Sequence, residues 1–288
     1  MSAPLRLPAV AGFFYEADPE RLREEVERCS KWDGTRLRAQ DWRALLLPHA
    51  GHVYSGRIAG AAIGRVAWPR RVILIGPNHR GTGAAASLSP AKAWRTPLGD
   101  VPADEAMTAQ LLAACPDLVP DAEAHAREHA LEVILPFLQV ARPELAIVCI
   151  SLAEPDYELC VRVGQAVAAV IERAEREGGE PIALVVSSDL NHYLARSANR
   201  AKDDRALEAL LEGDAAELFD RVLVRERISM CGILPATALL VALKELGSAP
   251  GHIVARGDSA DGGGEISRVV GYASVLWERT VGPAKEKS

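Results

Sequence analysis

The feature that most limits how this chain can fold is a set of short, unbroken runs of apolar residues. Such runs are expected of strands covered on both faces, whereas strands with one solvated face alternate apolar and polar residues. The runs span residues 44–47, 72–75, 145–152, 182–187 and 269–277. The sequence therefore predicts a sheet that is buried on both sides.

Segments with helical periodicity lie between these runs, since their apolar residues recur at i, i+3 and i+4. They span residues 56–67, 103–115, 155–177, 201–213 and 235–247, and the last two end at glycines suited to terminate a helix. This alternation predicts an α/β fold with a central, mainly parallel or mixed sheet flanked by helices. Because no repeat or linker divides the chain, we expect a single domain over residues 1–280 and a frayed polar tail over 281–288.

The composition narrows the classes of partner. A net charge of −6 without any Lys/Arg block argues against nucleic acid. No apolar stretch reaches the roughly 18 residues of a membrane span, and the N-terminus lacks a secretion signal, so we expect a cytoplasmic protein.

The five cysteines form no C-x-x-C motif and are expected as reduced thiols. The glycine-rich segment 256–268 lacks the order of a dinucleotide fingerprint and is expected to be a mobile loop.

Polar side chains collect where the apolar runs end. His49, His79 and the pair Asp189 and His192 each follow one of these runs. In an open α/β sheet, ligands bind beyond the carboxyl ends of the strands, so these three loops are predicted to converge. Cys231 stands just before an apolar helical segment. A thiol near a helix N-terminus is expected to have a lowered pKa, which favours the thiolate that metals bind.

His49, His79 and Cys231 together offer two imidazole nitrogens and one thiolate. This donor set suits iron(II), copper or zinc and is poor for magnesium or calcium. Three protein ligands leave coordination positions open, as in catalytic or substrate-binding sites. His192 and Asp189 are then predicted as acid–base or supporting groups, because imidazole titrates near neutral pH and a carboxylate can fix its tautomer.

Eight blocks of this sequence resemble the signatures of the Memo family, whose bacterial and archaeal members are called AmmeMemoRadiSam system protein B. The blocks are PAVAGFFYEAD (8–18), PHAGHVYSG (48–56), GPNHRGTG (76–83), TPLGDVPAD (96–104), EHALEVILPFLQ (128–139), SSDLNHY (187–193), MCG (230–232) and VVGYAS (269–274). The resemblance implies a fold similar to the class III extradiol ring-cleaving dioxygenases. It also implies that His49, His79 and Cys231 match the family's metal-binding positions, with Asp189 and His192 in the same pocket.

In those dioxygenases, two histidines and a carboxylate hold iron(II), and a further histidine acts as base on the catechol; His192 stands where that base is expected. The resemblance thus implies oxygen-dependent oxidation of a small aromatic or otherwise chelating substrate, with iron(II) as the expected ion and copper or zinc as alternatives. The family itself has Cys in place of the carboxylate, and thiolate sulfur is prone to oxidation. Asn78, Glu128, His129 and His52 are expected to line the pocket.

His52 stands where the family commonly has Tyr, and metal ligation, pocket lining and a solvent-facing loop role all stay open for it. Residues 125–129 also match H-x-x-E-H, which on a helix would place His125 and His129 on one face with Glu128 as the base of a zinc peptidase. A third reading is a non-catalytic module that binds a metal or a peptide, because eukaryotic members of the family are described as signalling adaptors. Bacterial members are often encoded beside a radical-SAM protein, which suggests a pathway partner.

Overall fold

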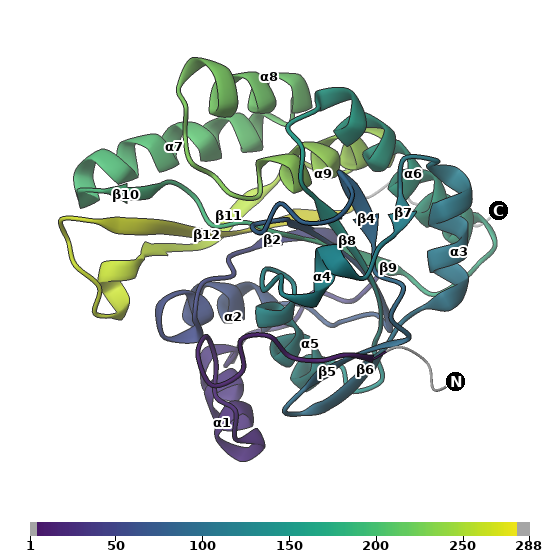
Figure 1. The fold of residues 1–288 in the computed structure, drawn as a ribbon, viewed down its shortest axis with the longest axis horizontal. Helices are drawn as coiled ribbons and strands as arrows, with labels where there is room; N and C mark the ends of the chain where they lie inside the picture. Colours follow the sequence, from purple (N-terminus) through teal and green to yellow (C-terminus); the bar gives the residue numbers. More distant parts are fainter. Residues whose placement is uncertain (1–4, 281–288) are drawn as a thin grey trace.

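The computed structural model describes residues 5–280 and contains a nine-stranded mixed sheet between layers of helices (Figure 1). The strands of this sheet are β2 (Trp42–Leu47), β3 (Arg71–Pro77), β4 (Ala86–Leu88), β7 (Val119–Pro120), β8 (Ala146–Leu152), β9 (Ile182–Ser187), β10 (His192–Leu194), β11 (His252–Asp258) and β12 (Val269–Glu278). Their order is β10-β12-β2-β9-β3-β8-β4-β7, with β11 beside β12. The predicted fold class is confirmed, and the predicted tail at 281–288 lies outside the described residues.

The four central strands, β2, β9, β3 and β8, run parallel to one another. All side chains of β2 are buried. Ala44 and Leu46 belong to one hydrophobic core, whereas Leu45 and Leu47 belong to the other. Successive side chains of a strand point to opposite faces, so two cores require an unbroken apolar run. This explains why the apolar runs of the sequence located the central strands.

Helices from different parts of the chain cover the two faces (Figure 1). One face is covered by α3 (Glu105–Ala114), α6 (Tyr157–Arg176), α7 (Arg196–Glu212), α8 (Ala215–Asp220) and α9 (Ile233–Glu245). The other is covered by α1 (Pro19–Cys29), α2 (Arg57–Ile63) and α5 (Leu135–Ala141). No helix within residues 5–280 is both long and apolar enough to span a membrane.

Helix ends agree less closely with the sequence pattern than helix cores do. Helix α7 begins at Arg196 rather than at residue 201, because its first turns are polar and carry no apolar periodicity. Both glycines predicted to end helices adopt the left-handed conformation that favours glycine, with φ of 79° at Gly213 and 62° at Gly247.

The sequence pattern missed the short elements. A second, three-stranded sheet joins β1 (Leu5–Arg6), β5 (Ala93–Thr96) and β6 (Gly99–Pro102), and α4 (Glu123–Ala126) is a single turn.

The prediction of a mobile loop over 256–268 is wrong in its first part. Strand β11 runs to Asp258, and a short 3-10 helix, Ser259–Gly262, follows with the Asp258 side chain as its N-cap.

Candidate metal centre

Three of the predicted site loops meet because their strands are neighbours. Strand β9 lies between β2 and β3, and all three are parallel, so their carboxyl ends open at one edge of the sheet. The backbone N–H of His49, after β2, donates to Oδ1 of Asp189, after β9, at 2.8 Å. The ring centroids of His49 and His79, after β3, are 5.1 Å apart. The convergence inferred from the sequence therefore occurs.

A third imidazole joins this pair. The ligand nitrogens of His49, His79 and His129 all lie within 4.8 Å of one another, close enough that the cluster could hold a metal ion. The rings of His79 and His129 are stacked, with centroids 4.6 Å apart. The sequence analysis predicted His129 as a residue lining this pocket, or as a histidine of the alternative zinc peptidase motif, but not as a partner of His49 and His79. It follows no strand and lies in the irregular turn between α4 and the 3-10 helix Glu132–Ile134, so its signals in the sequence were its place in a Memo signature block and in the H-x-x-E-H match.

Glu128 supports this cluster through two hydrogen bonds with His79. Its Oε1 accepts from Nδ1 of His79 at 2.9 Å and its Oε2 from the backbone N–H of His79 at 2.6 Å. Burial alone would raise the pKa of Glu128, but the hydrogen bond and charge of His79, with the backbone N–H of Ala130, lower it to about 2. A carboxylate on Nδ1 orients the ring and leaves Nε2 free for a cation.

The enclosed position of the cluster keeps two of its imidazoles neutral. Burial, together with the neighbouring His79, lowers the pKa of His49 well below its usual value. Burial and the neighbouring His49 lower the pKa of His129 to about 4, against the opposing effect of Glu128. A neutral imidazole has a lone pair to give to a metal, whereas an imidazolium has none. These two rings are therefore ready to bind a cation at neutral pH.

Cys231 lies beside the cluster, at the His49 edge. Its Sγ is 3.3 Å from Nε2 of His49 and accepts from the backbone N–H of Asp189 at 3.2 Å. The predicted lowering of its pKa is wrong for the thiol in this structure, because burial and the Asp189 carboxylate raise that pKa. Hydrogen bonds from the backbone N–H groups of Asp189 and Gly232 and from the Ser188 side chain lower this pKa but do not outweigh the two effects that raise it.

The turn that carries Cys231 packs tightly on the end of β9. A Cβ added to Gly232 would lie 2.3 Å from the carbonyl oxygen of Ser187 and 2.4 Å from Cβ of Ser188. Its backbone N–H donates to Oγ of Ser188 at 3.0 Å. Glycine at this position therefore lets the thiol approach the strand end that carries Asp189.

His192 is oriented by a residue that the sequence reasoning missed. Its Nδ1 lies 2.8 Å from the carbonyl oxygen of Ser229, and its backbone N–H donates to Oγ of Ser229 at 2.8 Å. Since a carbonyl oxygen only accepts, Nδ1 carries a proton, and in the neutral ring Nε2 then has the lone pair. The His192 ring is thus oriented by Ser229, whereas Oδ1 of Asp189 accepts from the backbone N–H of His49; the role of Asp189 as a supporting group of the site stays a prediction.

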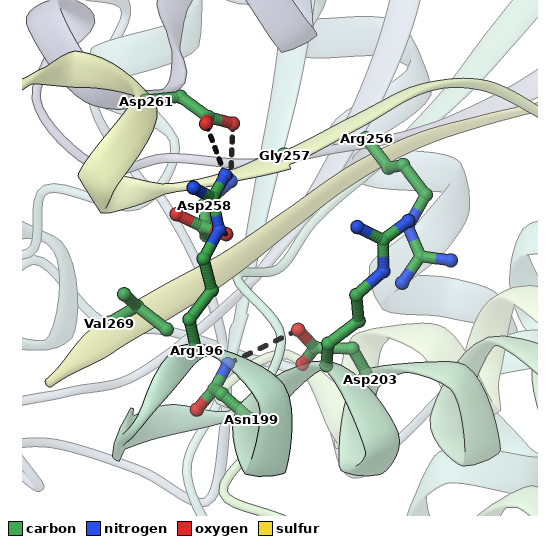
Figure 2. A pocket seen from close by; sticks show the side chains of 9 residues that line it. Arg196, Asn199, Asp203, Arg256, Gly257, Asp258, Asp261 and Val269 are labelled. Atoms are coloured by element: carbon green, nitrogen blue, oxygen red, sulfur yellow. Dashed lines mark hydrogen bonds and ion pairs between the residues drawn. The ribbon is translucent and has the colours of Figure 1, made fainter. Parts of the chain in front are cut away.

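A buried amide network supports the loop that carries His192. Asn191 Nδ2 donates to Oδ1 of Asn199 at 2.7 Å, and Asn199 Nδ2 donates to Oδ2 of Asp203 at 3.2 Å. Figure 2 shows this second contact on α7, below the ion pairs of Arg196. Oδ1 of Asn191 in turn accepts from the backbone N–H of Ser229 at 3.1 Å. The network thus joins α7 to Asn191 in the His192 loop and, through Asn191, to Ser229, which fixes the His192 ring.

His52 and Asn78, which were also predicted to line the pocket, make hydrogen bonds within the fold. Both ring nitrogens of His52 are engaged, Nε2 by the carbonyl oxygen of Val133 at 2.9 Å and Nδ1 by Glu25 at 3.2 Å, so neither is available to a cation. Oδ1 of Asn78 accepts from the backbone N–H groups of Arg80 and Gly81, which shapes the turn that presents His79.

The H-x-x-E-H stretch does not form the helical pair of a zinc peptidase. Helix α4 ends at Ala126, so His125 and His129 do not share a helix face. His125 is absent from the group of imidazoles that could hold a metal among the described residues. Its Nε2 contacts Oγ of Ser87 at 3.3 Å instead.

The chain is similar to known proteins over most of its length. A family model described as Memo-like protein matches residues 6–276. A MEMO1 family protein of Methanopyrus kandleri is 35% identical over 285 residues, covering 95% of this chain and 99% of that protein. A MEMO1 family protein of Methanocaldococcus jannaschii is 36% identical over 292 residues, covering 95% and 99%.

One solved structure, an uncharacterized protein of Escherichia coli K12, has a TM-score of 0.58 at 18% identity, covering 82% of this chain and 99% of that one. At this identity the likeness shows the fold alone. The family model and the two relatives show more than the fold, because their matches extend over nearly all of the described residues. The chain belongs to the Memo-like protein family.

Proposed function

We propose that this protein binds a metal ion through His49, His79 and a third donor, and uses it to oxidise a small aromatic or otherwise chelating substrate with oxygen. Iron(II) is the proposed ion, with copper or zinc as alternatives. The observation that carries the proposal is the cluster of three imidazoles within 4.8 Å at the carboxyl edge of the sheet. Nitrogen donors of this kind suit all three ions.

Two side chains compete for the third position. Cys231 is favoured by the resemblance to the family's metal-binding residues, and its Sγ lies 3.3 Å from Nε2 of His49. His129 is favoured by the mutual spacing of the imidazoles. A bound cation would favour the Cys231 thiolate over the thiol, which opposes the effect of burial on its pKa.

The residues around the cluster have separate roles in this proposal. A metal ion held by these residues with open coordination positions would supply a site for a chelating substrate and oxygen. Glu128 fixes the ring of His79, and Asp189 fixes the backbone of His49. Nε2 of His192 has a lone pair and is proposed to accept the proton of a substrate hydroxyl.

Metal analysis after anaerobic purification tests the ligand set. We expect close to one equivalent of metal in the wild type, a large loss in His79→Ala, and no change in the matched control His125→Ala. Comparison of His129→Ala with Cys231→Ala identifies the third ligand. Equal metal content in wild type and His79→Ala would refute the proposal, and loss of metal in His125→Ala would favour the zinc peptidase.

Oxygen uptake by the metal-loaded protein tests the reaction separately. A panel of catechols should include substrates that raise oxygen consumption in the wild type but not in His79→Ala. Full metal content without uptake across the panel would instead favour a non-catalytic binding module.

A further inference from the structure

A cavity of about 520 Å³ lies between the N-terminal strand β1, helix α4 and the segment that leads to β5. None of His49, His79, His129 or Cys231 lines it. Its volume is in the range of sites for small organic molecules. The cavity is therefore a candidate ligand site separate from the metal centre.

One part of the cavity is apolar. Leu5, Pro8, Pro90 and Ala91 are among the residues that line it. Ala91 is 9% exposed, so this wall of the cavity is continuous with the packed interior of the protein. Such a wall would shield the body of an apolar or aromatic ligand from water.

The charged residues of the cavity are all cationic. Arg80 and Arg127 line it and are exposed, and no Asp or Glu is among the lining residues. Arg6 also lines it, but its guanidinium is paired with Glu132. Within residues 5–280, neither Arg80 nor Arg127 forms an ion pair, and the contact between them is from Nε of Arg80 to the carbonyl oxygen of Arg127 at 3.3 Å. Two unpaired guanidinium groups favour an anionic ligand.

A buried histidine adds a third feature to the cavity. His125 lines it with 1% of its surface exposed, and its Nδ1 is buried without a hydrogen-bond partner among the described residues. Burial lowers the pKa of His125 to about 4, so the ring is neutral at pH 7. A buried polar atom left without a partner is unfavourable. A hydroxyl group could satisfy it in either tautomer, because a hydroxyl both donates and accepts.

We propose that this cavity binds a small organic acid, with its anionic group on Arg80 and Arg127 and its apolar body along Leu5, Pro8 and Ala91. A hydroxyl at the far end of the ligand completes the hydrogen bonding of His125 when the ring turns its buried Nδ1 toward the cavity. The site needs no metal and does not depend on the function proposed for the three-histidine cluster.

The probe for this site is 3-(4-hydroxyphenyl)propionate, titrated into the full chain while backbone amide shifts are followed by NMR. We expect saturable shifts at Leu7, Ala91 and Ala126, both in the wild type and in His79→Ala. Binding that disappears in His79→Ala, or shifts confined to residues 187–193, would mean that the carboxylate binds at the metal centre and would overturn the proposal. A protein without metal that still binds the probe separates this site from the proposed function.

Charge and hydrogen bonding are tested with matched variants and probes. The double variant Arg80→Gln/Arg127→Gln should weaken binding at least tenfold, and the exposed control Arg23→Gln should not. The neutral alcohol 3-(4-hydroxyphenyl)propan-1-ol should bind at least tenfold more weakly than the acid. Equal affinity in either comparison would refute an anion site. If the double variant fails to fold, each single variant is compared with the control.

The role of His125 is tested with 3-phenylpropionate, which lacks the hydroxyl. In the wild type the hydroxylated acid should bind more tightly than this probe, and in His125→Phe the two should bind equally. A hydroxyl preference that persists in His125→Phe would remove His125 from the site.

Discussion

The Oδ1 atom of Asp203 accepts a hydrogen bond from the backbone N–H of Asn191 at 2.8 Å, which ties helix α7 to the loop that carries Asp189 and His192. Asp203 is 4% exposed and has no ion-pair partner within residues 5–280, only hydrogen-bond donors. Its carboxyl also packs on the backbone of Gly271, where an added Cβ would lie 2.1 Å from Oδ2. A buried carboxyl with neutral partners should make the stability of this region depend on pH.

We predict that ionisation of Asp203 lowers the stability of the protein. Burial raises its pKa to about 6, although the hydrogen bonds from Asn191 and Asn199 oppose this. Since the folded pKa lies above the unfolded one, the stability due to its protonation is present at low pH and is lost as the pH rises through 6. Between pH 5 and 7.5, wild type should lose about 1 kcal/mol of unfolding free energy relative to Asp203→Asn. Urea denaturation at both pH values measures this, and a difference that does not change with pH would contradict it.

The fold could be read from the sequence where burial is two-sided. Strands β2 and β9 show unbroken apolar runs because helices cover both faces. Strand β10 has no such run, since it is three residues long with one half-buried and two exposed side chains, and it exists only through its pairing with β12. Pairing with a distant strand leaves no local pattern, so short edge strands were not predictable.

In the candidate site too, the residues that follow buried strands were predictable from the sequence, and the others were not. His49 and His79 follow buried strands, and the strand order brings these two loops together. His129 follows a single helical turn, and only the tertiary structure stacks its ring on His79. Ser229 acts through its backbone carbonyl, which any residue type could supply. Contacts made by backbone atoms or by turns leave little trace in residue identity.

Protonation of His129 should affect stability with the opposite sign to Asp203. Its pKa is lowered to about 4 by burial and by His49, so the unfolded chain takes up a proton near pH 6.5 that the folded protein does not. Stability due to the neutral ring is therefore lost as the pH falls below 6.5. In the presence of a chelator, wild type should lose about 2 kcal/mol relative to His129→Asn between pH 7.5 and 5. Chemical denaturation measures the difference, and a constant gap between the two proteins would show that the ring titrates normally.

Glu128→Gln should weaken metal binding without removing a ligand. The carboxylate accepts from Nδ1 of His79 at 2.9 Å, and an amide would lose the negative charge while keeping a similar shape. Loss of such a supporting group typically costs 10-fold to 100-fold in metal affinity. Competition with a chromophoric chelator measures the affinity, with the exposed Glu123→Gln as the control. Affinities of Glu128→Gln and wild type within about twofold would exclude this role for the carboxylate.

His192→Gln should separate metal binding from turnover. Nδ1 of His192 is held by the carbonyl oxygen of Ser229 at 2.8 Å, so the other ring nitrogen can accept a proton, whereas the Gln amide nitrogen cannot. A positioned general base typically contributes about 10²-fold to 10⁴-fold in rate. With a catechol that the wild type oxidises, kcat should fall by this amount while metal content stays unchanged. The control variant His252→Gln, at an exposed position, should leave both kcat and metal content unchanged. Ser229→Ala, which removes the Oγ contacts to the backbone N–H of His192 and to Oδ1 of Asn191, should cause a smaller fall because the carbonyl contact to the His192 ring survives. An oxygen electrode gives the rates, and a His192→Gln variant as fast as the wild type would assign the proton transfer to another group.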